Sequence, residues 1–181
     1  MAVISPIAMH GVVHALLGAL LIGALNTLGD LIWANFIPAH RPVFGILHGV
    51  VLCLGIGLYL GVLRQRPVRG AVEGALTGFV AASGFYVFAP FIGYSAMFVL
   101  WMALWVAFGI IEGRVLGEPR VSLREAVGRG VLAAVGSGAA FYAISGIWQR
   151  HPSGAADYAF RFVCWTFAFL PGFLALLARR R

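Results

Sequence analysis

Two histidines near the start of the chain have the spacing of metal ligands. His10 and His14 lie four positions apart, so on a helix they would share one face and could contact the same ion. No Glu follows His10, as it does in the His-Glu-x-x-His motif of zinc proteases, and no acid lies near the pair in sequence. We therefore expect hydrogen-bonded histidines here and no metal site.

A haem held between His14 and His48 is a second site that the histidines suggest. Each histidine stands near the start of an apolar segment, and consecutive membrane helices run in opposite directions. At ~1.5 Å rise per residue the two rings would differ in depth by more than about 10 Å. One iron cannot reach both rings, and we expect no cofactor.

Asp30 and His48 are placed to form a small polar cluster. Both fall at the same side of the predicted membrane, where Arg41 could join them. Ionisable residues in membrane segments are functional candidates by default. A small transporter or a lipid-handling enzyme would use this cluster.

Two other acid–base pairs have the four-residue spacing that joins side chains on one helix face. Glu73 follows Arg69, and Arg161 follows Asp157. Both pairs stand at the ends of apolar segments, so we interpret them as helix-end ion pairs and not as a proton relay. The sequence shows no Ser-His-Asp set, deep carboxylate pair, phosphate loop or nucleotide fingerprint, which favours a protein that is not an enzyme.

The composition places these residues in a membrane protein. The chain has 181 residues, of which 61% are hydrophobic and only 10% are charged, whereas a soluble domain carries about 25% charged residues. So few charges cannot cover a surface in water, and 24 glycines agree with membrane helices. Cys53 and Cys164 both lie in apolar segments, so we expect core cysteines without a disulfide.

Six apolar segments have about the 20-residue length that a bilayer requires. They cover approximately Met9–Trp33, Val43–Leu63, Gly70–Phe88, Tyr94–Ile111, Glu125–Trp148 and Tyr158–Leu177. Turns are predicted at Ala89–Gly93 and Pro152–Gly154, and the longest loop at Glu112–Arg124. The sequence thus predicts an all-α integral membrane protein in which residues 1–181 form a single six-helix bundle. We find no inverted repeat of the kind that many transporters carry.

The basic residues set the expected orientation. All 13 are arginines, and the net charge is +7. Ten of them fall on one predicted side: Arg64, Arg66, Arg69, Arg114, Arg120, Arg124, Arg129, Arg179, Arg180 and Arg181. The positive-inside rule then places both termini in the cytoplasm. Because these arginines stand in short loops beside apolar segments, we expect anionic lipid headgroups as partners and not nucleic acid.

Small residues recur every four positions in the third segment. Gly70, Gly74, Gly78 and Ala82 would lie on one helix face, which lets another helix approach closely in lipid. We also expect that the chain can form a homo-oligomer. The use of Arg without Lys is typical of a GC-rich genome, so we expect a bacterial plasma membrane.

Aromatic residues are frequent in the last four segments. Many are explained as lipid-facing bulk or as an interfacial belt. Others, opposed by small residues such as Gly78, Ala82 and Gly138, could line a pocket for an apolar ligand. The residues expected to contact a lipid are Asn26, Phe85, Trp105, Phe141, Gln149 and Trp165.

The second half of the chain resembles the Insig family of six-helix membrane proteins with cytoplasmic termini. Leu104-Trp105 with Phe108 is similar to the family's Leu-Trp-Trp-Thr-Phe segment, and Ser145–Gln149 resembles its Asn-Gly-Val-Tyr-Gln turn. Asp157 and Arg161 are similar to an Asp and an Arg before the last helix, and Asn26 to an Asn in the first helix. The resemblance implies a sterol-like or other lipid ligand in a pocket among the first, third, fourth, fifth and sixth helices.

The chain also departs from that family. Gly109 stands where the family has an Asp that is important for partner binding, an Asn-His-Ala-Ser stretch is missing around Phe85, and apolar sequence replaces a polar residue near Ile92. The family's animal partners are therefore not carried over. We expect a non-enzymatic protein that binds or senses a sterol-like or diacylglycerol-like membrane lipid, with the transporter or enzyme at Asp30, His48 and Arg41 as the alternative.

Overall fold

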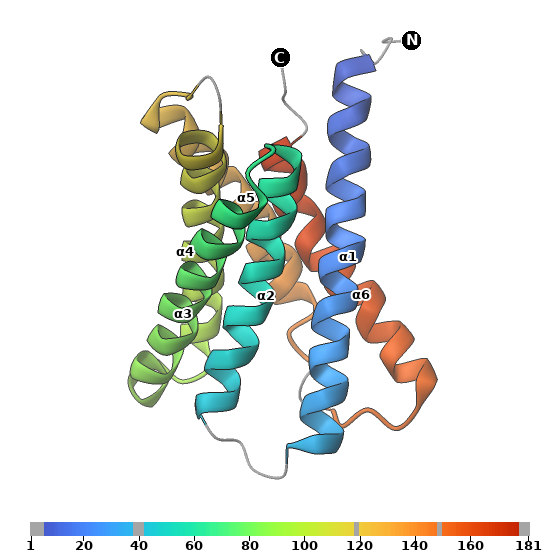
Figure 1. The fold of residues 1–181 in the computed structure, drawn as a ribbon. Helices are drawn as coiled ribbons and strands as arrows, with labels where there is room; N and C mark the ends of the chain where they lie inside the picture. Colours follow the sequence, from blue (N-terminus) through green and yellow to red (C-terminus); the bar gives the residue numbers. More distant parts are fainter. Residues whose placement is uncertain (1–5, 38–41, 118–119, 148–149, 178–181) are drawn as a thin grey trace.

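The computed structural model describes residues 6–37, 42–117, 120–147 and 150–177, and it is built from long helices (Figure 1). These are α1 (Pro6–Phe36), α2 (Pro42–Leu63), α3 (Pro67–Ile92), α4 (Ser95–Ile110), the π-helical η1 (Ile111–Leu116), α5 (Leu123–Ala143) and α6 (Ala155–Leu177). Six spans in the described residues are long and apolar enough to cross a membrane, with α4 and η1 forming one of them. The prediction of an all-α chain with six membrane-length helices is confirmed.

Several boundaries differ from the predicted ones, and three of them change a predicted turn, loop or helix end. Helix α3 does not turn at Ala89 but continues through Pro90 to Ile92, because one proline near a helix end removes only one internal hydrogen bond. Gly93 ends the helix with a φ of 60°, which glycine adopts without strain. The start of the predicted loop 112–124 is η1, which continues the span from α4. Helix α5 ends at Ala143, earlier than expected.

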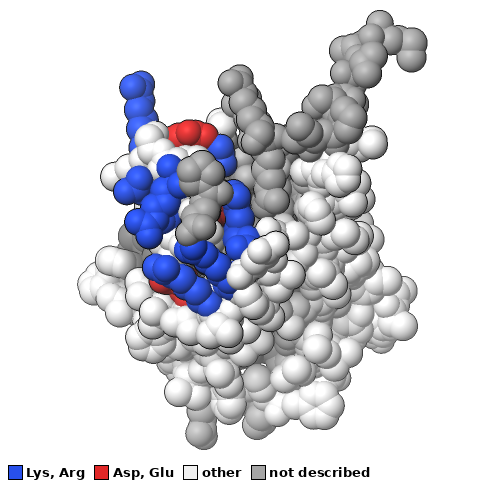
Figure 2. All heavy atoms as spheres, turned by 45° about the horizontal axis from the view of Figure 1, so that its top comes forward, with Lys and Arg blue, Asp and Glu red and all other residues white. Residues whose placement is uncertain are grey.

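The helices form three antiparallel pairs: α2 with α3, α4 with α5, and α1 with α6. Helix α1 begins and α6 ends at the same end of the bundle, together with the α2–α3 turn and η1 (Figure 1). We call this the arginine-rich end, because arginine side chains gather there on an otherwise largely uncharged surface (Figure 2). The opposite, arginine-poor end holds the turn between α3 and α4 and the segment between α5 and α6.

The α2–α3 pair is held by close approach of the two backbones. Gly70, Gly74 and Gly78 are buried on the face of α3 that meets α2. A Cβ built on Gly74 would overlap with the carbonyl oxygen of Cys53, and one on Gly78 would overlap with that of Gly49. This backbone contact requires glycine, as in other closely packed membrane helices.

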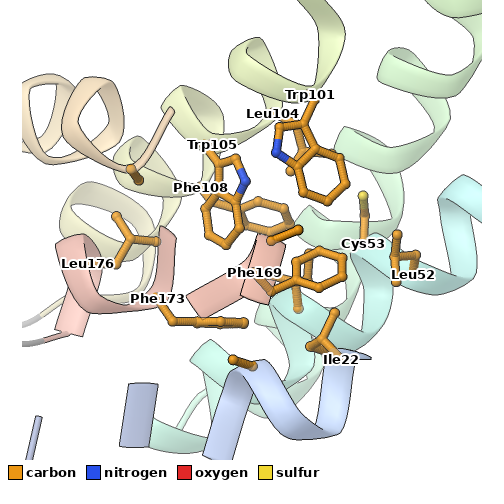
Figure 3. Close-up of a cluster of buried hydrophobic side chains, with 14 of the residues drawn as sticks. Ile22, Leu52, Cys53, Trp101, Leu104, Trp105, Phe108, Phe169, Phe173 and Leu176 are labelled. Carbon is orange, nitrogen blue, oxygen red and sulfur yellow. The ribbon is translucent and has the colours of Figure 1, made fainter. Parts of the chain in front are cut away.

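Aromatic side chains fill the centre of the bundle (Figure 3). Trp105 of α4 is completely buried and meets Phe173 of α6 edge to face, with 5.5 Å between ring centroids. Trp101 of α4 stacks on Phe141 of α5 at 4.4 Å, and it lies 5.0 Å from Phe169 of α6. Aromatic contact thus joins α4, α5 and α6.

Ser137 of α5 forms hydrogen bonds with α4 and with α6, close to a proline in α6. Pro171 lies inside this helix and cannot donate a backbone hydrogen bond. Ser137 of α5 is fully buried; its Oγ donates to the carbonyl oxygen of Ala168 at 2.6 Å and accepts from Trp101 Nε1 at 2.9 Å. Ser137 thus joins α5 to α4 and α6 by hydrogen bonds, as polar side chains do between membrane helices.

Candidate functional site

Arg161 is the centre of a buried polar network at the arginine-poor end. Its Nη1 donates to Asp30 Oδ2 of α1 at 3.1 Å, and Trp165 Nε1 donates to the same oxygen at 2.8 Å. Its Nη2 donates to the carbonyl oxygens of Ile147, at 2.8 Å, and of Arg150. The side chains of Arg161 and Asp30 are only 8% and 17% exposed. One guanidinium therefore ties α6 both to α1 and to the segment that follows α5.

The predicted pair between Asp157 and Arg161 is not the contact that the structure shows. Asp157 Oδ2 instead accepts hydrogen bonds from the backbone N–H of Ser153 at 2.7 Å and from Ser153 Oγ at 2.5 Å. Arg161 points into the bundle, where a buried charge needs a carboxylate and carbonyl oxygens to compensate its lost hydration. Asp157 is therefore a helix-start residue of α6, whereas Arg161 serves long-range packing.

A second polar contact adjoins this network on α1. His48 Nε2 of α2 donates to Asn26 Oδ1 at 3.1 Å, and Asn26 is only 3% exposed. Asn26 and Asp30 are one helical turn apart on α1, so the two polar contacts are neighbours. Gly29 leaves the space that the His48 ring occupies. Of the predicted cluster of Asp30, His48 and Arg41, the structure places His48 on Asn26, one helical turn from Asp30. Arg41 lies outside the described residues.

An open cleft of about 490 Å³ lies beside Arg161, between the end of α5 and the start of α6. Its polar side is formed by Arg150, His151, Ser153 and Asp157. The remaining lining residues are Ala143, Ile144, Gly146, Ile147, Pro152, Phe160, Arg161 and Cys164. The cleft is amphipathic: polar groups stand at the end of the bundle, and apolar side chains continue along α6.

The residues predicted to contact a lipid do not all gather in one place. Trp105, Phe141 and Trp165 belong to the packed core, and Trp105 Nε1 is buried without a hydrogen-bond acceptor among the described residues. Phe85 lies on α3 against Tyr86, with 5.1 Å between ring centroids. Trp165 is the one that also reaches the polar network, through Asp30.

The other two residues predicted to contact a lipid are Asn26 and Gln149. Asn26 is held by His48 in the neighbouring polar contact. Gln149 lies outside the described residues. Sequence reasoning missed Arg161 as a central residue, although an arginine inside the aromatic run Phe160–Trp165 was a visible signal.

The described residues contain no group of three or more His, Cys, Asp or Glu side chains that could hold a metal ion. Comparison of the chain with protein-family models, with curated proteins and with solved structures gives no match. The chemistry of the site therefore rests on its own geometry.

Proposed function

We propose that this chain is a non-enzymatic membrane protein that binds a sterol-like or diacylglycerol-like lipid in the cleft between α5 and α6. The observation that carries the proposal is the amphipathic lining of the cleft beside a fixed, buried arginine. Lipid sites combine an apolar wall with a few polar groups that orient the head. The likeness to the Insig family supports the same kind of ligand.

The polar side of the cleft favours a neutral head that carries a hydroxyl group. Arg161 already donates hydrogen bonds to Asp30 and to two carbonyl oxygens, so its positive charge is largely compensated. Asp157 presents a carboxylate and Arg150 a guanidinium at the rim. A hydroxyl group can donate to the first and accept from the second, so a neutral head with a hydroxyl group fits this rim.

The orientation is part of the proposal. The arginine-rich end would face the cytoplasm of a bacterial plasma membrane, where its side chains would contact anionic lipid headgroups (Figure 2). The cleft would then open in the outer leaflet. A lipid would enter sideways from the bilayer, with its head at Ser153 and its body along Phe160.

Native mass spectrometry after purification in mild detergent tests the proposal. A lipid of the sterol or diacylglycerol class should stay bound to the wild-type protein and be displaced by an excess of the same class. Phe160→Ala removes an apolar wall of the cleft and should lower retention several-fold. Phe167→Ala is the matched control, because Phe167 is also an exposed α6 phenylalanine, 53% exposed against 60% for Phe160, and does not line the cleft. Equal retention by both variants would refute the proposed site.

The alternative, a small transporter or lipid-handling enzyme at Asp30 and His48, is supported by the adjacency of their two polar contacts within the membrane-length helices. It predicts that His48→Ala abolishes uptake or turnover while the protein stays folded. The lipid-binding proposal predicts that His48→Ala leaves lipid retention nearly unchanged. One variant thus separates the two functions.

A further inference from the structure

A second groove lies between α3 and α4 in the half of the bundle next to the arginine-rich end. It has a volume of about 320 Å³. Its lining is almost entirely apolar and consists of Glu73, Leu76, Thr77, Val80, Ala81, Leu100, Ala103, Leu104 and Ala107. Glu73 and Ala107 lie toward the arginine-rich end, whereas Val80, Ala81 and Leu100 lie deeper in the bundle.

The shape of the groove follows from the packing of α3. This helix turns its glycine face to α2, so a different face meets α4. The short side chains of Ala81, Ala103 and Ala107 leave space there, and the buried Leu104 forms the floor. From Glu73 to Ala81 the groove runs for about 12 Å at 1.5 Å per residue, which suits part of an acyl chain.

Opposite charges stand at the mouth of the groove. Arg69 Nε lies 4.0 Å from Glu73 Oε1, and the two side chains are 51% and 34% exposed. Both therefore remain accessible, and the pair is too exposed to contribute much to stability. The exposed carboxylate and guanidinium together offer an acceptor and donors to a lipid head that carries one positive and one negative charge.

We propose that this groove binds a phospholipid with a primary ammonium head, such as phosphatidylethanolamine. Glu73 accepts hydrogen bonds from the ammonium group, Arg69 donates to the phosphate, and an acyl chain lies between Leu76, Val80 and Leu100. Phosphatidylcholine has no N–H donor for Glu73, and phosphatidylglycerol has no positive charge. This site is separate from the cleft at Arg161 and does not depend on the function proposed for it.

Native mass spectrometry of the full chain, titrated with these three lipids of equal chain length, tests the inference. The wild-type protein should bind phosphatidylethanolamine about tenfold more tightly than either of the others, a difference of about 1.4 kcal/mol. Glu73→Gln should remove that preference. Glu125→Gln should keep it, because Glu125 is an exposed acid at the same end of the bundle that does not line the groove.

A steric variant keeps the test decisive if Glu73→Gln does not fold. Ala103→Phe leaves Arg69 and Glu73 in place but fills the exposed part of the groove, and it should lower binding of phosphatidylethanolamine several-fold. Equal binding of the three lipids by the wild-type protein would overturn the inference. An equal loss of preference in Glu73→Gln and Glu125→Gln would also overturn it, since general electrostatics at this end would then explain the binding.

Discussion

Arg161 of α6 donates a hydrogen bond to Asp30 of α1 at 3.1 Å, although 131 positions separate the two residues. The same guanidinium donates to carbonyl oxygens of the segment that lines the cleft. One ion pair thus connects the packing of α1 against α6 with the shape of the candidate lipid site.

Loss of the Asp30 charge should destabilise the fold. In Asp30→Asn the buried Arg161 loses its carboxylate partner, and breaking such a pair costs up to about 3 kcal/mol. Chemical unfolding in detergent micelles measures the change. Trp165→Phe removes one hydrogen bond to Asp30 and also shortens a buried core side chain, and it should cost at least about 1 kcal/mol. If Asp30→Asn unfolds at the same denaturant concentration as the wild-type protein, the ion pair does not contribute to the stability of the fold.

Ser137 should contribute measurably to the stability of the fold, although its side chain is small. Ser137→Ala leaves the Trp101 indole N–H without this acceptor and removes one donor from the Ala168 carbonyl oxygen, and an unpaired buried donor costs about 1–3 kcal/mol. Thermal unfolding followed by circular dichroism should show a lower midpoint. Ser83→Ala, a half-buried serine of α3, is the control and should change the midpoint little. Equal midpoints for the two variants would contradict the role assigned to Ser137.

Two glycine substitutions should have opposite effects. Gly74→Ala pushes a methyl group into the Cys53 carbonyl oxygen, so α2 and α3 must separate and the protein should be destabilised by more than about 1 kcal/mol. Gly128→Ala adds a methyl group where the described residues leave open space, and alanine favours a helix by about 1 kcal/mol. Unfolding midpoints of the two variants provide the comparison, and a stable Gly74→Ala protein would rule out the tight backbone contact.

Substitution of Glu112 should destabilise the fold more than substitution of the other acids at the arginine-rich end. It is fully buried in η1, where Oε1 accepts from Arg64 Nε at 3.0 Å and Oε2 lies 3.7 Å from Arg129 Nη1. Glu112→Gln removes the charge that both arginines face, and we expect a loss of about 3 kcal/mol in unfolding free energy. Glu125→Gln, at a side chain 50% exposed, should cost less than about 1 kcal/mol. Similar losses in both variants would argue against a special role for Glu112.

The helices could be predicted because each is a long apolar run, and hydropathy alone identifies such runs. The polar contacts between the helices could not be predicted in this way. Local spacing paired Arg161 with Asp157, but the carboxylate that it contacts lies on α1. Glu112 was expected in a loop because a charge interrupts the apolar sequence, yet Arg64, 48 positions away, compensates it inside the fold. Contacts between distant helices leave no periodic signal in one sequence.

Photo-crosslinking with diacylglycerol and sterol probes, followed by peptide mapping, tests the central claim most directly. We predict that the label falls on residues 143–164, that unlabelled lipid of the same class prevents it, and that Phe160→Ala reduces it while Phe167→Ala does not. Label spread over the lipid-facing surfaces of the helices, unaffected by competitor, would contradict a lipid site between α5 and α6.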